Sequence, residues 1–139
     1  GAKLMFAYGE ATVPKVTVTL RKSYGGAHDV MSCKQLRGDF NYAWPTAQIA
    51  VMGAKGAIEV LYGKEVAAIT DPEEKAKFIA EKEAEYNTAF ANPYKAASYG
   101  YIDDVIEPRN TRFRVIRAFQ SLQTKRVTNP MKKHSNIPL

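Results

Sequence analysis

The chain has 139 residues, 45% of them hydrophobic, and a formal net charge of +6 at pH 7. A chain of this size and composition buries enough apolar surface for a core, which excludes an intrinsically disordered protein. It has no apolar run of about 18 residues and no secretory signal pattern at its start, so we expect a soluble, non-exported protein. The single cysteine, Cys33, cannot form an internal disulfide, and with only His28 and His134 beside it we expect no metal site.

The positive charge lies in the last part of the chain. Residues 1–107 carry 12 basic and 14 acidic side chains, whereas residues 108–139 carry eight basic and no acidic ones. Such a stretch can contact nucleic acid or an anionic membrane, or it can form a helix that is solvated or faces another subunit. Phe113 and Phe119 fall at core-like spacing and do not alternate with the charges as a stacking platform requires. We therefore expect no nucleic-acid partner.

The first half of the chain predicts a repeated local pattern. A helix is expected over residues 3–11, without a start signal, as if the chain opened inside an element. Alternating apolar and polar side chains predict a strand over residues 15–21. A tight turn with two glycines at residues 23–27 and a helix over residues 28–36 follow, and Cys33 is expected to be buried within this helix.

A second unit has the same order. The apolar run at residues 47–52 predicts a buried strand, and a helix follows over residues 54–61. Two strand–glycine–helix units in succession predict an α/β layered fold. The segment between them, residues 39–45, is aromatic and rich in turn formers, so we expect it to form a pocket wall with Tyr42 and Trp44.

Helices dominate the rest of the prediction. Asp71 is a good N-cap for a helix that reaches about residue 91, whose charges form a solvated face. Residues 96–105 predict a turn and a short extended piece, and a last helix covers residues 111–125 before a proline-punctuated tail at residues 129–139. The inward side chains of the last helix are expected to be Val115, Ile116, Phe119 and Leu122.

No side-chain constellation identifies an enzyme. Cys33 lies in a predicted helix without a local base, and Asp103–Asp104 is best interpreted as a turn with solvated charges. The glycine turn is more informative, because the backbone N–H groups of Gly26 and Ala27 form a donor pair that can stabilise an oxyanion. The same spacing also occurs in ordinary tight connections. The spacing alone leaves both interpretations open.

Several long segments, in order and spacing, resemble one family. They are EATVPKVTVTLRKSYGGAHDVMS, GDFNYAWPTAQIAVMGAKGAIEVLY, FANPY, YIDDVIEPRNTR and KKHSNIPL. They resemble the C-terminal part of acyl-CoA carboxyltransferases, namely the beta subunits of propionyl-CoA carboxylase and the alpha subunits of methylmalonyl-CoA decarboxylase. The resemblance implies an α/β, crotonase-like (ClpP/crotonase) fold of repeated ββα units. It also implies that residues 1–139 are an incomplete C-terminal portion of the biotin-side domain, without the N-terminal acyl-CoA domain.

In this family a carboxyl group moves between the N1′ nitrogen of biotin, carried on a partner domain, and the α-carbon of a coenzyme A thioester. The resemblance implies that the amides of Gly26 and Ala27 hold the biotin ureido oxygen. It places Asp29 at the acyl pocket, with a preference for propionyl-CoA and methylmalonyl-CoA. His28 stands where the family has a tyrosine. The other residues expected in the pocket are Gly25, Tyr42 and Trp44.

The resemblance also implies partners. A biotin carboxyl carrier protein or domain acts with either a biotin carboxylase subunit or the membrane subunits of a sodium-pumping decarboxylase, and the chain forms trimers or hexamers. The expected compartment is the cytoplasm, with membrane association through partners, or the mitochondrial matrix in a eukaryote. The alternative hypothesis is a subunit-interaction module that is inactive without the N-terminal half. Both hypotheses predict exposed apolar surface for a partner.

Overall fold

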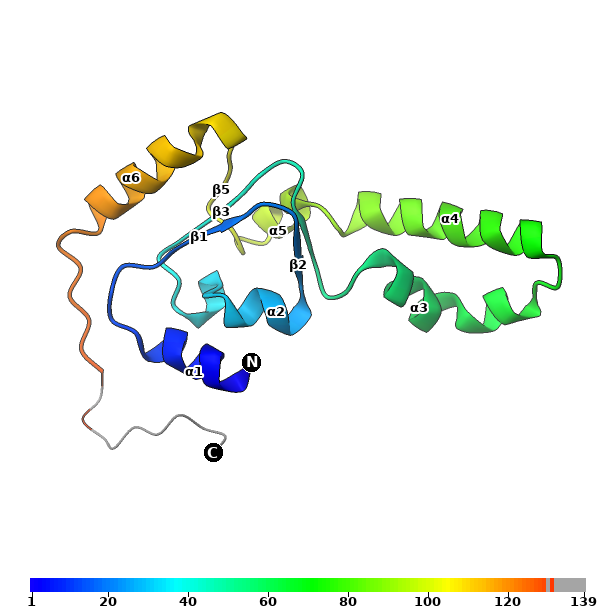
Figure 1. Cartoon of the computed structure of the whole chain (residues 1–139), viewed down its shortest axis with the longest axis horizontal. Coiled ribbons are helices and arrows are strands. Elements are labelled where there is room, and N and C mark those ends of the chain that lie inside the picture. The colour runs from blue at the N-terminus through cyan, green and yellow to red at the C-terminus, as the bar shows by residue number, and fades with distance from the viewer. Residues whose placement is uncertain (130, 132–139) are drawn as a thin grey trace.

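The computed structural model describes residues 1–129 and residue 131. Figure 1 shows a body of short strands and helices from which a long helical hairpin, α3 and α4, projects. The elements in chain order are α1 (Ala2–Glu10), β1 (Val16–Thr19), β2 (Lys22–Tyr24), α2 (Gly25–Val30), η1 (Lys34–Leu36), β3 (Phe40–Ala43), β4 (Gln48–Ala50), α3 (Ala54–Ala68), α4 (Pro72–Ala89), α5 (Pro93–Ser98), β5 (Asp104–Val105), η2 (Pro108–Asn110) and α6 (Thr111–Ser121). None of the helices described here is long and apolar enough to cross a membrane.

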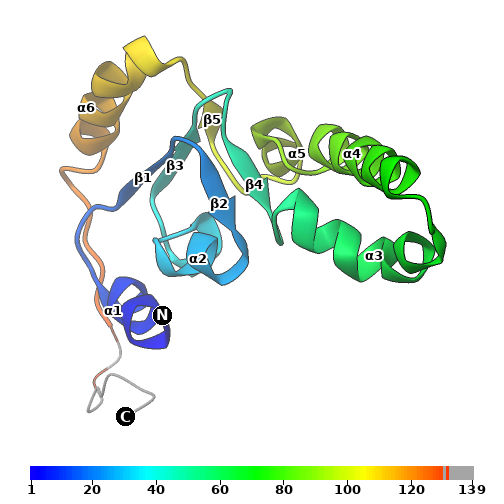
Figure 2. The same ribbon diagram turned by 45° about the vertical axis from the view of Figure 1, so that its right-hand side comes forward.

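The body contains two ββα units, β1–β2–α2 and β3–β4–α3. Their first strands pair in a parallel three-stranded sheet of order β1-β3-β5, and their second strands pair in a parallel two-stranded sheet, β2-β4. Figure 2 shows both sheets between α6 on one side and α5 on the other. The expected α/β fold of repeated ββα units is confirmed.

The prediction of one strand over residues 15–21 and a turn at residues 23–27 is wrong in detail. The chain turns a corner at Leu20 and Arg21 and then forms β2, which belongs to the second sheet. Hydrogen bonds hold this corner: the Trp44 amide donates to the Thr19 carbonyl at 2.9 Å, and the Gln48 amide donates to the Arg21 carbonyl at 2.7 Å. Apolar alternation identified the strand but carried no signal for the change of sheet.

The helix predicted over residues 28–36 is broken. Helix α2 begins earlier, at Gly25, and ends at Val30, because Ser32 takes a positive φ of 64° and the Thr17 hydroxyl donates to carbonyls at the helix end. The chain then makes the short turn η1. Cys33 lies between them with 1% of its surface exposed, so its predicted burial is confirmed.

Residues 39–45 do not form a turn-rich pocket wall. Residues Phe40–Ala43 are β3, the central strand of the three-stranded sheet. The Asp103 carboxylate accepts a hydrogen bond from the Asn41 backbone amide at 2.8 Å and forms an ion pair with Lys34. Asp104 forms an ion pair with Arg114. Both aspartates stay partly exposed, as predicted, but each also forms an ion pair that the sequence did not indicate.

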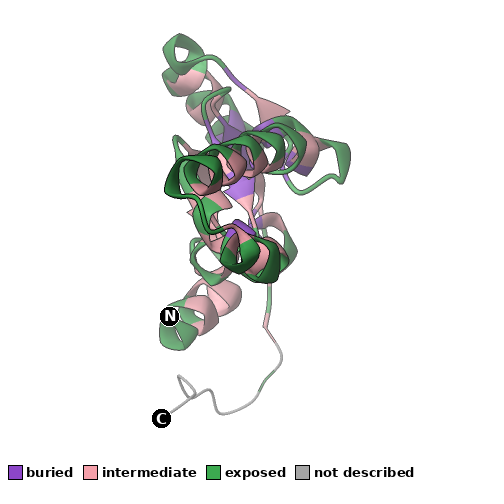
Figure 3. Cartoon of the chain, turned by 90° about the vertical axis from the view of Figure 1, so that its right-hand side faces the viewer, coloured by how far each residue is buried: buried purple, intermediate pink, exposed green. Residues whose placement is uncertain are grey.

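Two buried clusters hold the body together. One joins the two sheets to α5 and consists of Ala43, Ala47, Ile49, Ala96 and Ile102. The other joins the three-stranded sheet to α6 and consists of Tyr42, Ile106 and Ala118, with Val16, Val18, Phe40 and Trp44 packed against it. Figure 3 shows the buried residues concentrated in the sheets, whereas the projecting hairpin is mostly exposed or half-buried.

The hairpin of α3 and α4 packs mainly on itself. The rings of Tyr62 and Phe78 meet edge to face with centroids 6.1 Å apart. Asp71 caps α4 by accepting a hydrogen bond from the Glu74 amide at 2.9 Å, as predicted. The helix predicted over residues 54–61 is too short, because α3 continues to Ala68.

The last helix departs from its prediction in length and burial. Helix α6 ends at Ser121, and only Ala118 is buried, whereas the expected inward residues Ile116 and Phe119 are 44% and 45% exposed. The other two expected inward residues, Val115 and Leu122, are half-buried.

The segment after α6 returns to the first helix. The Lys125 ammonium donates to the Val13 carbonyl at 2.9 Å and to the Asp39 carboxylate at 2.7 Å, and the Asn129 side-chain amide donates to the Glu10 carbonyl at 2.7 Å. The expected helix over residues 3–11 is confirmed as α1. Part of the basic end is thus bound to its own chain. In the predicted tail, residues 130 and 132–139, which include His134, lie outside the described residues.

Candidate functional site

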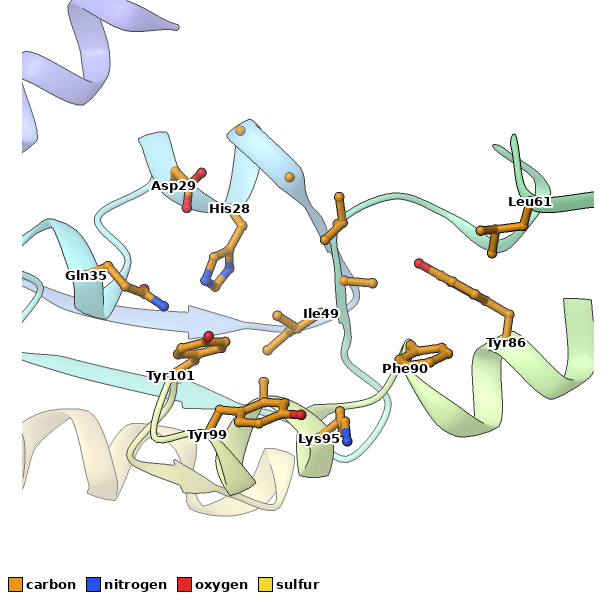
Figure 4. A pocket seen from close by; sticks show the side chains of 15 residues that line it. His28, Asp29, Gln35, Ile49, Leu61, Tyr86, Phe90, Lys95, Tyr99 and Tyr101 are labelled. Atoms are coloured by element: carbon orange, nitrogen blue, oxygen red, sulfur yellow. The ribbon is translucent and has the colours of Figure 1, made fainter. Parts of the chain in front are cut away.

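A cavity of about 730 Å³ opens where the two strands of the smaller sheet end. Gly25 and Gly26 follow β2, and Ala50 and Val51 lie at the end of β4. Because β2 and β4 are parallel neighbours, their carboxyl ends meet at one edge, the usual place for a ligand in an open α/β sheet. Figure 4 shows the side chains that surround the cavity.

The two glycines of the turn have different surroundings. Gly25 has a φ of +48°, and a Cβ atom there would lie 2.7 Å from the Val51 carbonyl oxygen. This close approach of the two strand ends therefore requires glycine. At Gly26 a Cβ atom would meet nothing within 4 Å. Gly26 lines the cavity, and both Gly26 and Ala27 are exposed.

His28 and Asp29 follow on the same helix and line the cavity. The Nδ1 atom of His28 lies 2.9 Å from the Ser23 hydroxyl oxygen, which links α2 to β2. Burial lowers the pKa of His28, and the neighbouring Asp29 carboxylate opposes this change only in part. The imidazole is therefore neutral at neutral pH.

An aromatic wall faces α2 across the cavity. Tyr86 and Phe90 come from the end of α4, with ring centroids 5.4 Å apart, and Tyr99 and Tyr101 follow α5, with centroids 5.7 Å apart. The Tyr86 hydroxyl donates to the Met52 carbonyl at 3.1 Å, which ties the wall to the loop after β4. The wall gives the cavity the apolar and aromatic lining typical of small-molecule sites.

A positive charge belongs to the same wall. The Lys95 ammonium lies 4.9 Å from the centroid of the Tyr99 ring, and no carboxylate among the described residues pairs with it. Lys95 and Asp29 both line the cavity, so a ligand meets one cation and one anion there.

Sequence reasoning missed this wall. The predicted helix from Asp71 to about residue 91 carries no sign that Tyr86 and Phe90 line a cavity, and α5 was not predicted. A signal for α5 was present: Asn92 caps it by accepting from the Lys95 amide at 2.9 Å, and Pro93 occupies its first turn. No sequence spacing indicates that Tyr101 faces a cavity formed by β2 and β4.

The predicted site residues divide into two groups. Gly25, Gly26, His28 and Asp29 lie together on the cavity, and Ala27 is exposed directly beside them. Tyr42 and Trp44 lie elsewhere, in the buried cluster between the three-stranded sheet and α6. Burial raises the pKa of Tyr42, with Arg114 over its ring at 5.4 Å, and the Trp44 indole donates to the Thr111 hydroxyl at 2.8 Å. The structure does not bring these two aromatic residues to the cavity, because β3 turns them towards α6.

Comparison with known proteins identifies the class. The carboxyl transferase domain family matches residues 1–137, and the chain belongs to this family. The propionyl-CoA carboxylase beta chain of Cereibacter sphaeroides is 63% identical over 139 residues, which are 100% of this chain and 26% of the relative. The human propionyl-CoA carboxylase beta chain, named as mitochondrial, is 53% identical over 140 residues, which cover 100% of this chain and 24% of the relative.

Solved structures agree with the fold. Transcarboxylase 12S, described as a hexamer assembly with methylmalonyl-coenzyme A and methylmalonic acid bound, matches with a TM-score of 0.87 and 51% identity over 99% of this chain and 26% of its own. The fold is therefore the crotonase-like fold of the carboxyltransferases. The chain spans about a quarter of the length of the relatives that it matches.

Proposed function

We propose that this chain forms the biotin-side part of an acyl-CoA carboxyltransferase, corresponding to the C-terminal portion of its C-terminal domain. The reaction is transfer of a carboxyl group between carboxybiotin and an acyl-CoA, with propionyl-CoA and methylmalonyl-CoA as the favoured pair. The observation that carries this proposal is the position of Gly25–Asp29: the segment that carries the resemblance lies on the cavity at the ends of β2 and β4. The family match over residues 1–137 supports it.

The residues present fit a biotin ring. The open space at Gly26 leaves its backbone accessible, and the cavity of about 730 Å³ has room for a small bicyclic ring against an aromatic wall. When bound, biotin supplies the nitrogen that carries the carboxyl group. The amides of Gly26 and Ala27 would donate to the ureido oxygen and stabilise negative charge on it. Asp29 would lie beside the acyl group, and the aromatic wall would exclude water.

The wider setting is also a proposal. A biotin carrier domain, a biotin carboxylase or membrane decarboxylase subunit, and a trimer or hexamer of carboxyltransferase subunits would complete the enzyme. We propose the cytoplasm, or the mitochondrial matrix in a eukaryotic cell, as the compartment.

A role of the chain alone as an interaction module is the second candidate function. It is favoured by the exposed apolar residues of α6, Phe113, Ile116 and Phe119, which are 44% to 62% exposed.

The test uses the complete carboxyltransferase subunit that carries this sequence. We expect it to transfer the carboxyl group from methylmalonyl-CoA to free biotin, measured as propionyl-CoA formed. Gly26→Val fills the space beside the donor amides and is expected to lower turnover at least about 100-fold. Gly63→Val is the matched control, because a Cβ atom at Gly63 in α3 also meets nothing within 4 Å, away from the cavity. Normal turnover by the Gly26 variant would refute the assignment.

A further inference from the structure

A hydrogen-bonded pair, Ser23 and His28, lies on the cavity outside the roles proposed above. The two residues come from β2 and α2, and the His28 Nδ1 atom lies 2.9 Å from the Ser23 hydroxyl oxygen. Figure 4 shows the imidazole projecting into the cavity towards Tyr101, beside Ile49 and Gln35. The Nε2 atom makes no hydrogen bond to any described residue, and His28 is among the residues that line the cavity.

The hydroxyl of Ser23 determines which nitrogen carries the proton. This half-buried hydroxyl has one proton, and within the described part of the chain its one hydrogen-bond partner is His28. We assign the hydroxyl as the donor to Nδ1, which places the imidazole proton on Nε2, whereas the reverse arrangement, with Nδ1–H donating to the hydroxyl, would make Nε2 an acceptor. The result is a side chain held in one orientation with an N–H group directed at the cavity.

The charge state of the ring follows from its surroundings. Burial lowers the pKa of His28 and outweighs the opposing effect of Asp29, so the ring is a neutral donor at neutral pH. The other titratable groups on the cavity are Tyr86 at the end of α4, Lys95 on α5, and Tyr99 and Tyr101 after it. Among these groups only Asp29 carries negative charge at neutral pH.

We propose that His28 is a binding and specificity-determining residue whose Nε2–H, oriented by Ser23, donates a hydrogen bond to an oxygen of the carboxyl group that is transferred. This inference rests on the proposed function, in which the amides of Gly26 and Ala27 already hold the ureido oxygen. The carboxyl oxygens of the ligand are charged acceptors that those two amides leave free for a further donor. A ligand that places a donor at this position would be rejected, because the Nε2–H group would remain unpaired.

The test measures kcat/KM for carboxyl transfer from methylmalonyl-CoA to free biotin by the complete subunit. His28→Phe keeps a ring of similar size without the donor, and it is expected to lower kcat/KM about tenfold. His28→Gln retains a donor near the Nε2 position and is expected to recover about a third of the parent value. Ser23→Ala releases the ring orientation and should fall between the parent and His28→Phe. A purely structural role predicts the opposite order, since phenylalanine preserves packing better than glutamine.

Two further measurements address the donor itself. Below the lowered pKa of His28 the ring carries a proton on both nitrogens, so Nε2–H remains a donor while the Ser23 hydroxyl becomes the acceptor. The parent and His28→Gln should therefore lose activity to the same extent on the acidic side, whereas a steeper loss in the parent would show that the neutral ring acts in another way. Nitrogen NMR, with the His28 signals assigned by their loss in His28→Gln, should show the proton on Nε2. A proton on Nδ1 would overturn the proposal.

The outcomes separate the two proposals. A parent subunit without carboxyl transfer refutes the proposed function, and the inference falls with it. An active parent whose His28→Phe variant keeps its full kcat/KM refutes only the role of His28, and so does equal impairment of His28→Phe and His28→Gln.

Discussion

Replacing Gly25 by alanine tests whether the cavity edge depends on the close approach of two strand ends. Gly25 has a φ of +48°, and its Cβ atom would lie 2.7 Å from the Val51 carbonyl oxygen, where ordinary contacts begin at 3.4 Å. A non-glycine residue in this backbone region costs about 1 kcal/mol, and forcing apart packed atoms costs about 1–3 kcal/mol more. We therefore expect Gly25→Ala to lower the free energy of unfolding by about 3 kcal/mol.

The neighbouring glycine provides a matched control. A Cβ atom at Gly26 meets nothing within 4 Å, and its φ lies outside the left-handed region. Gly26→Ala should therefore leave the free energy of unfolding unchanged or raise it by about 0.5 kcal/mol, because alanine restricts the unfolded chain. The two variants differ by one position but should differ in stability by more than 2 kcal/mol, on the order of the backbone and overlap costs together.

The assay is urea denaturation followed by circular dichroism, with all variants of the 139-residue chain at one protein concentration. With a slope of about 2 kcal/mol per molar urea, the Gly25 variant should unfold at a midpoint about 1.5 M lower than the parent. Equal midpoints for the two alanine variants would show that the Val51 carbonyl yields at no cost, and would refute the argument that this edge requires glycine.

Two further predictions concern Gly38 and Asp39, which do not line the cavity. Gly38→Ala should destabilise the chain by about 3 kcal/mol, since its Cβ atom would lie 2.5 Å from the Ser32 carbonyl oxygen and 2.7 Å from the Asn41 side-chain nitrogen; a denaturation midpoint equal to the parent's would contradict this. Burial opposes ionisation of Asp39, but hydrogen bonds from Lys125 and the Lys15 amide outweigh it and hold the pKa of Asp39 below its usual range. This stabilisation is present above the unfolded pKa of 3.8 and is lost as pH falls through the lower folded value. Unfolding free energies measured between pH 7 and pH 2 should therefore decline less steeply for Asp39→Asn than for the parent, and identical slopes would count against the Asp39–Lys125 clamp.

Local signals in the sequence predicted the elements whose causes are local. The cap at Asp71 and the proline after it determine where α4 starts, and the chain begins that helix as expected. The glycine pair at Gly25 and Gly26 indicated a tight strand-to-helix connection, and the structure has one. These features depend on backbone geometry over a few residues, so the local sequence is enough to indicate them.

Long-range pairing produced the features that the sequence did not predict. Residues 39–45 contain turn formers and a proline, yet β3 is the central strand because it pairs with β1 on one side and β5 on the other. Tyr42 and Trp44 therefore face α6, and aromatic residues 57 positions further along, Tyr99 and Tyr101, line the cavity instead. Sequence spacing contains no information about such pairings. Gly25 and Gly26 lie on the cavity as expected, whereas Tyr42 and Trp44 do not.

In the last helix, α6, the apolar sequence pattern does not correspond to burial. Phe113, Ile116 and Phe119 recur at helical spacing, which normally indicates a core-facing side, yet all three are at least 44% exposed. Ala118 alone makes the buried contact with the sheet. A helix that keeps a regular apolar face without burying it on its own chain is typical of a surface that packs against further protein. Because the chain spans about a quarter of its relatives' length, this face supports the proposal that the cavity performs carboxyl transfer only within the complete subunit.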